Sequence, residues 1–189
     1  MGFNSRECFD TFLVLFVLRE IVMPQHHAHK AHAASSSPSY VTTFIADHLA
    51  KAQAIQRQYG IPAGIVIAQS ALETNWGRRV VANAYFGVKG HAPDGSSATF
   101  GTHEIVGGAS VAIQGTFRAY SGFDDAAEDY ARTVSSDPKY RVCYTQPSAS
   151  KCAVALQHNG YATDKHYAAK LNVIIRAHKL DQYDAKATQ

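Results

Sequence analysis

The hydrophobic pattern changes its period twice along the chain, and this constrains the fold more than any other feature of the sequence. Across residues 44–76 apolar side chains recur every three or four positions, which is typical of amphipathic helices. Across residues 100–118 they alternate with polar side chains around Gly107-Gly108, a pattern typical of two strands joined by a two-residue turn. Helical spacing then returns. A helical body interrupted by one antiparallel hairpin predicts an α+β fold, with a cleft between the body and the hairpin lobe that suits an extended ligand.

Helix-end signals divide the helical part into five predicted helices. These cover residues 44–59, 62–76, 124–134, 150–157 and 164–178. Gly60 follows the first helix as a left-handed end residue, and Asp164 is placed to cap the last one. Either Asp124 or Asp125 caps the third, with Glu128 completing a capping box.

The first 33 residues differ from the rest of the chain. The apolar run at residues 12–18 is shorter than the ~20 residues of a transmembrane helix and is typical of the apolar centre of a signal peptide. Ala31-His32-Ala33 then matches a signal-peptidase site. Arg6, however, is offset by two acidic neighbours, so a disordered extension and a mis-assigned start codon stay open. The predicted organisation is a leader or disordered extension at 1–33, a linker at 34–39, a folded domain at 40–183 and a tail at 184–189.

The charge balance argues against a nucleic-acid-binding protein. The 18 Lys and Arg residues exceed the 15 Asp and Glu residues by only +3, and they form no dense basic block. The hydrophobic fraction of 46% is that of a globular domain. We therefore expect a monomer with no nucleic-acid partner and no stable membrane span.

Two cysteines of the domain are predicted to form a disulfide. Cys143 and Cys152 lie nine positions apart across a proline-containing loop, a separation that a hairpin-like loop can close. Two unpaired, apolar thiols are the alternative. Histidines also cluster at residues 26–32, but without cysteine or carboxylate companions and within the predicted leader. No metal site and no cofactor are expected.

Glu73 is the first candidate catalytic residue. It lies near the end of an apolar predicted helix, beside Leu72 and three positions before Trp76, where a carboxylate is poorly solvated and its protonated form is favoured. A general acid that protonates the leaving oxygen of a glycosidic bond needs this property. The alternative is an ordinary solvated glutamate on the polar side of the last helical turn.

Glu104 is the candidate for the second carboxylate that glycoside hydrolysis requires. It is the only acidic residue in the strands of the predicted hairpin and shares a face with Phe100 and Thr102. A solvent-facing strand residue is the alternative. Asp94 is a rival, but its Pro-Asp-Gly setting is typical of a turn.

Five segments of the sequence resemble, in order, those of glycoside hydrolase family 73, the glucosaminidase domain of bacterial autolysins and of the flagellar rod muramidase. They are I-P-A-G-I-V-I-A-Q-S-A-L-E-T-N-W-G at 61–77, N-A-Y-F-G-V-K-G at 83–90, T-H-E-I-V-G-G at 102–108, F-R-A-Y-S-G-F-D-D-A-A-E-D-Y at 117–130 and G-Y-A-T-D-K-H-Y-A-A-K-L at 160–171. The resemblance covers residues 40–180, and the ordered series is far more specific than any single segment.

The resemblance implies a lysozyme-like α+β fold and hydrolysis of the β-1,4 bond after N-acetylglucosamine in peptidoglycan. Glu73 matches the family's general acid, and Glu104 matches the acid of the β lobe less securely. Tyr161 matches an aromatic near the acid in the cleft, where its phenol would steady the acetamido group or a water molecule; a core tyrosine before a helix cap is the alternative. Phe86, Tyr120 and Tyr167 are expected either to line the sugar groove or to pack in the core.

One position departs from the family pattern: Lys165 replaces the usual proline after Asp164, at a helix start where catalysis should not be affected.

Three functions stay open. The preferred one is an endo-β-N-acetylglucosaminidase acting on peptidoglycan strands; a muramidase or lytic transglycosylase and a non-catalytic glycan-binding module are the alternatives. The leader and the predicted disulfide favour a periplasmic or secreted protein of a bacterium.

Overall fold

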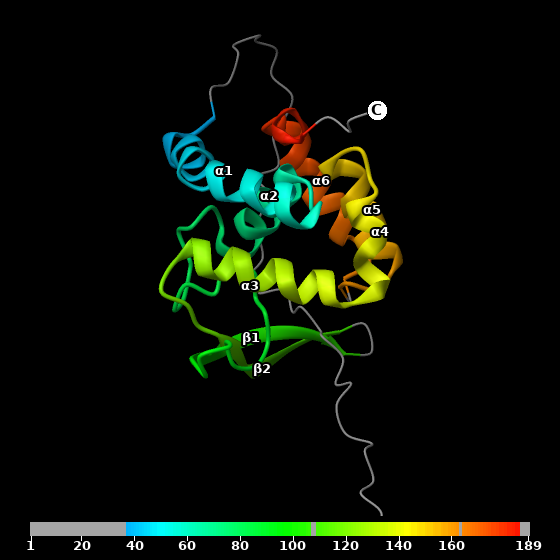
Figure 1. Cartoon of the computed structure of the whole chain (residues 1–189). Helices are drawn as coiled ribbons and strands as arrows, with labels where there is room; N and C mark the ends of the chain where they lie inside the picture. Colours follow the sequence, from blue (N-terminus) through cyan, green and yellow to red (C-terminus); the bar gives the residue numbers. More distant parts are fainter. Residues whose placement is uncertain (1–36, 107–108, 163, 186–189) are drawn as a thin grey trace, which may run out of the picture.

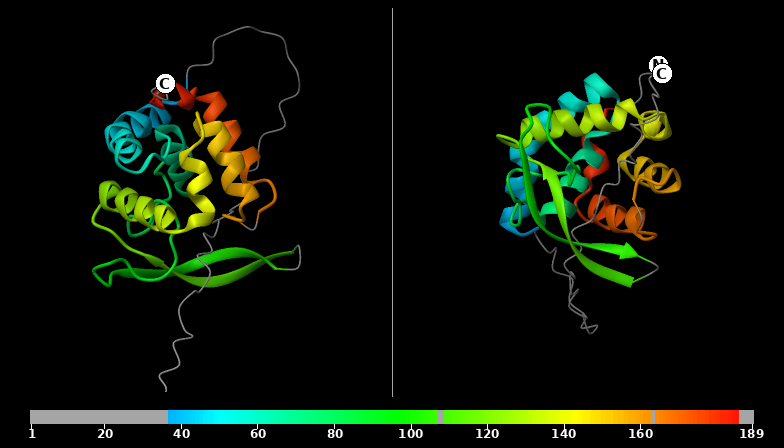
Figure 2. Two further views of the ribbon diagram at one scale, coloured as in Figure 1. Left: turned by 45° about the vertical axis from the view of Figure 1, so that its right-hand side comes forward. Right: turned by 90° about the horizontal axis from the view of Figure 1, so that it is seen from below.

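The computed structural model describes residues 37–106, 109–162 and 164–185. The predicted leader, with Cys8 and the histidine cluster, lies outside the described residues. The elements in chain order are α1 (Ser39–Tyr59), α2 (Ala63–Thr74), β1 (Ser97–Val106), β2 (Ala109–Arg118), α3 (Phe123–Ser136), η1 (Pro138–Tyr140), α4 (Arg141–Tyr144), α5 (Ala149–His158), α6 (Tyr167–Ala177) and η2 (Leu180–Tyr183). Figure 1 shows a helical body with the β1–β2 hairpin below α3, and the left view of Figure 2 shows the same separation after a turn about the vertical axis. The α+β prediction is confirmed.

Helix α2 forms the centre of the body. Ten of its 12 residues are buried, and it packs against α1, α5, α6 and η2. Its start approaches its neighbours so closely that a Cβ on Gly64 would lie 2.8 Å from the carbonyl oxygen of Leu180 and 2.9 Å from the Cβ of Ala149. Only glycine fits there, because real Cβ contacts are not that short.

A single carboxylate joins the starts of two helices. Asp184 accepts hydrogen bonds from the backbone N–H of Gly64 on α2 and of Ala149 on α5, both over 2.7 Å. Unpaired N–H groups at helix starts need such acceptors. Asp184 falls in the predicted tail, so the tail boundary was wrong: the folded unit extends at least to this residue.

The hairpin prediction is confirmed. Strands β1 and β2 pair antiparallel from Ser97 opposite Arg118 to Val106 opposite Ala109, a register that leaves two residues for the turn. The turn itself, Gly107-Gly108, lies outside the described residues. Near the other end of the hairpin, the rings of Phe100 and Phe117 stack with centroids 4.5 Å apart.

Helix α2 ends earlier than its hydrophobic spacing predicts. It ends at Thr74, and Asn75, Trp76 and Gly77 follow with φ angles of 50°, 59° and 75°. Three successive left-handed residues cannot continue a right-handed helix, so Trp76 belongs to the turn after α2 although it keeps the helical period.

The predicted caps of α3 and α6 were also wrong. Gly122 precedes α3, and Asp124 and Asp125 lie in its first turn, where acidic residues suit the helix dipole. Glu128 binds Lys51 on α1 instead of closing a capping box. Asp164 accepts from the N–H of His166 in the turn before α6, which starts at Tyr167. The short elements η1 and α4 were not predicted.

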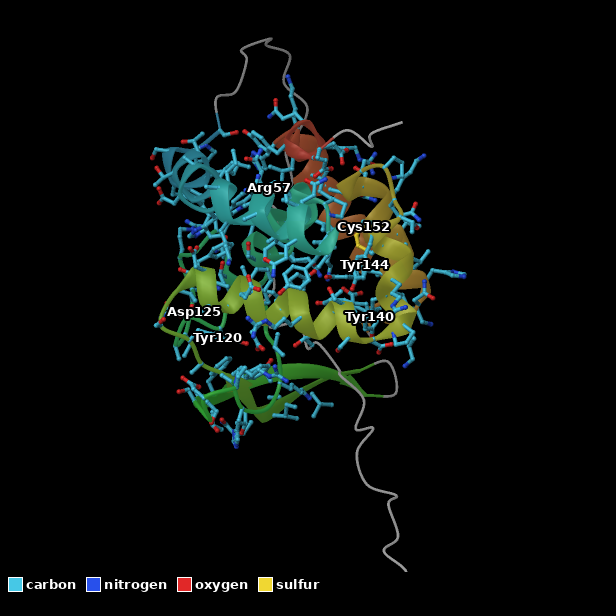
Figure 3. All side chains as sticks on the ribbon, in the orientation of Figure 1. Arg57, Tyr120, Asp125, Tyr140, Tyr144 and Cys152 are labelled. Atoms are coloured by element: carbon cyan, nitrogen blue, oxygen red, sulfur yellow. A yellow bond between two sulfur atoms is a disulfide. The ribbon has the colours of Figure 1, made fainter. Side chains whose placement is uncertain are left out.

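Cys143 and Cys152 form a disulfide between α4 and α5 (Figure 3). Their Cα atoms are 4.4 Å apart, within the range that disulfides adopt, and both residues are fully buried. The cross-link closes a loop with a sequence separation of nine.

We expect the double variant Cys143→Ser, Cys152→Ser to lose about 3 kcal/mol of unfolding free energy, because a cross-link of this span restricts the unfolded chain by about that amount. Urea unfolding of purified protein measures the loss. Cys8→Ser, which keeps the pair, is the matched control. Equal stability of the double variant and this control would show that the disulfide adds nothing.

Candidate active site

The last turn of α2 fixes the position of Glu73. The hydroxyl of Thr74 donates to the carbonyl of Ser70 over 2.6 Å and accepts from the N–H of Gly77 over 2.8 Å. The N–H of Trp76 donates to the carbonyl of Ala71 over 2.9 Å. Glu73 therefore stands on a helix end held from both sides. It is partly buried, and its Oε2 atom is shielded from solvent.

A buried polar network lies one helical turn before Glu73. Gln69, only 3% exposed, donates from Nε2 to the phenol oxygen of Tyr167 over 2.5 Å. Its Oε1 accepts from the hydroxyl of Tyr130 on α3. Residues four apart share a helix face, so Gln69 and Glu73 face the same neighbours. A buried amide with both ends bonded is well fixed, because losing either partner is costly.

Two buried phenols of this network lie close to Glu73. Tyr161 and Tyr167 are each 1% exposed, and their rings stack with centroids 5.6 Å apart. Burial is the main cause that raises the pKa of both phenols well above the usual value; neighbouring tyrosines and then the negative charge of Glu73 raise it further. Both phenols therefore stay protonated and lie within electrostatic reach of the carboxylate.

The structure brings Glu73, Tyr161 and Tyr167 together but does not bring all the predicted aromatics to one surface. Tyr161, Tyr167 and Phe86 pack in the core, the second role that sequence left open for each of them; Phe86 is 2% exposed and stacks on Tyr130 at 4.4 Å. Tyr120 lies between α3 and the hairpin, where its hydroxyl donates to Asp129 over 2.7 Å (Figure 3).

The two candidates for the second acid occupy different settings. Glu104 lies on β1 with its backbone opposite Val111, and its side chain lies outside the described part of the chain. Asp94 is an exposed turn residue whose Oδ1 accepts from the N–H of Ser96 over 2.8 Å. The hydrogen bonds from Ser96 lower the pKa of Asp94, which fits a turn better than acid chemistry.

Sequence reasoning missed Gln69 and Tyr130. Gln69 had a usable signal, because it is a polar residue in the middle of an otherwise apolar helix and such residues need buried partners. Tyr130 had none, since only the packing of α3 against α2 brings it to Gln69. In the parts of the chain that the structure describes, no group of three His, Cys, Asp or Glu residues is placed to hold a metal ion.

A family model described as mannosyl-glycoprotein endo-beta-N-acetylglucosaminidase matches residues 49–180. The chain is 35% identical to the peptidoglycan hydrolase FlgJ of Escherichia coli (strain K12) over 152 residues, covering 76% of this chain and 49% of that protein. It is 36% identical to the exo-glucosaminidase LytG of Bacillus subtilis (strain 168), covering 70% of this chain and 50% of that protein. The chain thus spans about half the length of these curated relatives.

The fold is also that of a solved catalytic domain. The crystal structure of the catalytic domain of the autolysin Auto from Listeria monocytogenes superposes with a TM-score of 0.66 at 32% identity, covering 80% of this chain and 92% of that one. The α+β arrangement is therefore the lysozyme-like one that the motifs imply. Sequence motifs, family model and fold agree: the chain belongs to the glucosaminidase family of glycoside hydrolase domains.

Proposed function

We propose that this protein is a peptidoglycan hydrolase that cleaves the β-1,4 bond between N-acetylglucosamine and N-acetylmuramic acid within glycan strands, with Glu73 as the general acid. The observation that carries the proposal is the setting of Glu73, which combines an oxygen shielded from solvent with two buried, protonated phenols nearby. The relatives named as a peptidoglycan hydrolase and an exo-glucosaminidase support the substrate class.

Glu73 has the properties that protonation of a leaving oxygen requires. Its Oε2 is shielded from solvent, and a glutamic acid can donate a proton to a leaving oxygen. Once the proton has moved to the glycosidic oxygen, the carboxylate needs hydrogen-bond donors. The phenols of Tyr161 and Tyr167 are such donors within electrostatic reach, and Gln69 fixes one of them. In this proposal Glu104 supplies the second carboxylate, which holds the attacking water or stabilises the oxocarbenium-like transition state.

The proposed site of action is the bacterial cell wall, outside the cytoplasm. The disulfide suits an oxidising compartment, and the apolar run at residues 12–18 supports export. The net charge of +3 favours attraction to a polymer whose stem peptides carry carboxylates. No helix in the described residues is long and apolar enough to cross a membrane.

Mass spectrometry of digested peptidoglycan tests the proposal. We expect fragments with reducing N-acetylglucosamine ends, because the proposed cut follows that sugar. Digestion with the Glu73→Gln variant is the blank. Anhydromuramic ends would instead identify a lytic transglycosylase, reducing muramic ends a muramidase, and the absence of products a glycan-binding module. Any of these three results would overturn the proposed specificity.

A further inference from the structure

The open end of the hairpin, where β2 ends at Arg118, is called its root below. It is bonded to helix α3 through one carboxylate. Arg118, the last residue of β2, donates from Nη1 to Oδ2 of Asp129 over 2.8 Å and to the hydroxyl of Thr133 over 3.3 Å. Tyr120, two residues later, donates to the same Oδ2 over 2.7 Å. Asp129 and Thr133 are four positions apart, so they lie on one face of α3. Two donors from the exit of the hairpin therefore meet on one carboxylate of the body.

This contact is shielded from water. Asp129 is 7% exposed, and the side chain of Arg118 is 17% exposed. Salt screens such a pair much less than a surface pair, and a charged donor shortens and strengthens its hydrogen bond. Burial is the main cause of the raised pKa of Tyr120, and the charge of Asp129 adds to it, so this phenol keeps its proton and remains a donor.

The other contacts at the root join the hairpin to the preceding loop. The N–H of Arg118 donates to the carbonyl of Val88 over 2.8 Å, and the N–H of Gly90 donates to the carbonyl of Thr116 over 3.0 Å. Phe117, fully buried, packs with Ala84 of the same loop. These contacts join the root to a loop that itself packs on α3, where Phe86 stacks on Tyr130. Asp129 lies on α3 and, through Arg118 and Tyr120, joins the exit of the hairpin to that helix directly, so it is in the position to set the angle.

A small rotation of the hairpin at its root produces a large displacement further along its strands. From Arg118 to Val111 the strand extends over seven residues, or about 23 Å at about 3.3 Å per residue. A rotation of about 10° at the root would move that position by about 4 Å by the same geometry. Val111 pairs with Glu104, so small changes at Asp129 become large changes at the proposed second acid. Figures 1 and 2 show the strands running from α3 along the body.

We propose that Asp129 is a positioning residue that holds the hairpin at a fixed angle to α3 and thereby sets where Glu104 stands relative to Glu73. The catalytic consequence rests on the proposed function; the angle itself does not.

Distance measurement between two spin labels tests the angle. The labels are placed on Val111→Cys of β2 and Val173→Cys of α6, both exposed positions, in a full chain carrying Cys8→Ser, so that the disulfide stays intact. We expect one narrow distance distribution with Asp129 present, and a distribution shifted or broadened by about 4 Å in Asp129→Ala. On peptidoglycan the same variant should lose at least tenfold in kcat, with KM changed less than threefold.

Two further variants keep the test decisive. Arg118→Lys covers the case in which Asp129→Ala does not fold. The single ammonium of lysine cannot reach Asp129, Thr133 and the Lys89 carbonyl together, so the distance distribution should broaden as in Asp129→Ala. Glu128→Gln is the matched control, because Glu128 neighbours Asp129 but binds Lys51 and Tyr59 of α1. It should leave distances and activity unchanged.

An unchanged distribution in the folded variants, or equal broadening in Glu128→Gln, would overturn the positioning role. If the unmutated protein releases no fragments from peptidoglycan, the proposed function fails, while the distance measurement still decides whether Asp129 sets the angle.

Discussion

Glu73→Gln is expected to lower the rate of peptidoglycan hydrolysis at least about a thousandfold, which corresponds to about 4 kcal/mol of lost transition-state stabilisation. Glutamine has nearly the size of glutamate and keeps the packing at the end of α2, but its amide cannot donate a proton to a leaving oxygen. Since the hydrogen bonds of Thr74 to Ser70 and Gly77 hold the last turn of α2, the fold should survive the change.

The measurement is the initial rate on purified peptidoglycan, together with thermal unfolding of both proteins. A melting temperature close to that of the unmutated protein shows that the loss is chemical. A folded Glu73→Gln variant with a rate within tenfold of normal would assign proton donation to another group, because loss of the only general acid cannot be so mild.

The helices and the hairpin could be predicted where local pattern decides the structure. The helix before Gly60 ends as predicted because that glycine takes a left-handed conformation, with φ at 75°. The hairpin keeps its register because alternation and a two-residue turn agree. The predicted end of α2 was wrong because the apolar period continues to Trp76. The helix in fact ends before Asn75, a residue that tolerates left-handed backbone.

The network around Glu73 could not be predicted because its members are distant in sequence. Gln69 meets Tyr130 and Tyr167 across 61 and 98 positions, and no spacing rule connects them. The motif resemblance predicts that Tyr161 lies close to Glu73, but only the packing of the helices shows that this tyrosine is buried. The role of Asp184 could not be predicted for the same reason. Nothing in the sequence connects this residue with the two helix starts that it joins.

Glu104→Gln is expected to lower the hydrolysis rate about a hundredfold or more, since a group that holds the water or stabilises a positive transition state loses its charge. The change lies near the turn end of β1, a strand whose pairing with β2 depends on backbone hydrogen bonds, so the hairpin should be retained. Asp94→Asn is the matched control. It removes one carboxylate from an exposed turn nearby in sequence and should keep the rate within about threefold.

The double variant Glu73→Gln, Glu104→Gln distinguishes a shared reaction from two separate defects. Two carboxylates that act on the same transition state are expected to be non-additive, so the double variant should be little slower than Glu73→Gln alone. If the two defects instead multiply, Glu104 acts in a step independent of proton donation, such as binding of the glycan strand. A nearly normal rate in Glu104→Gln, with a large loss in Asp94→Asn, would assign the role of second carboxylate to Asp94. Normal rates in both variants would leave the acetamido group of the substrate as the nucleophile, because the reaction still needs a group opposite the acid.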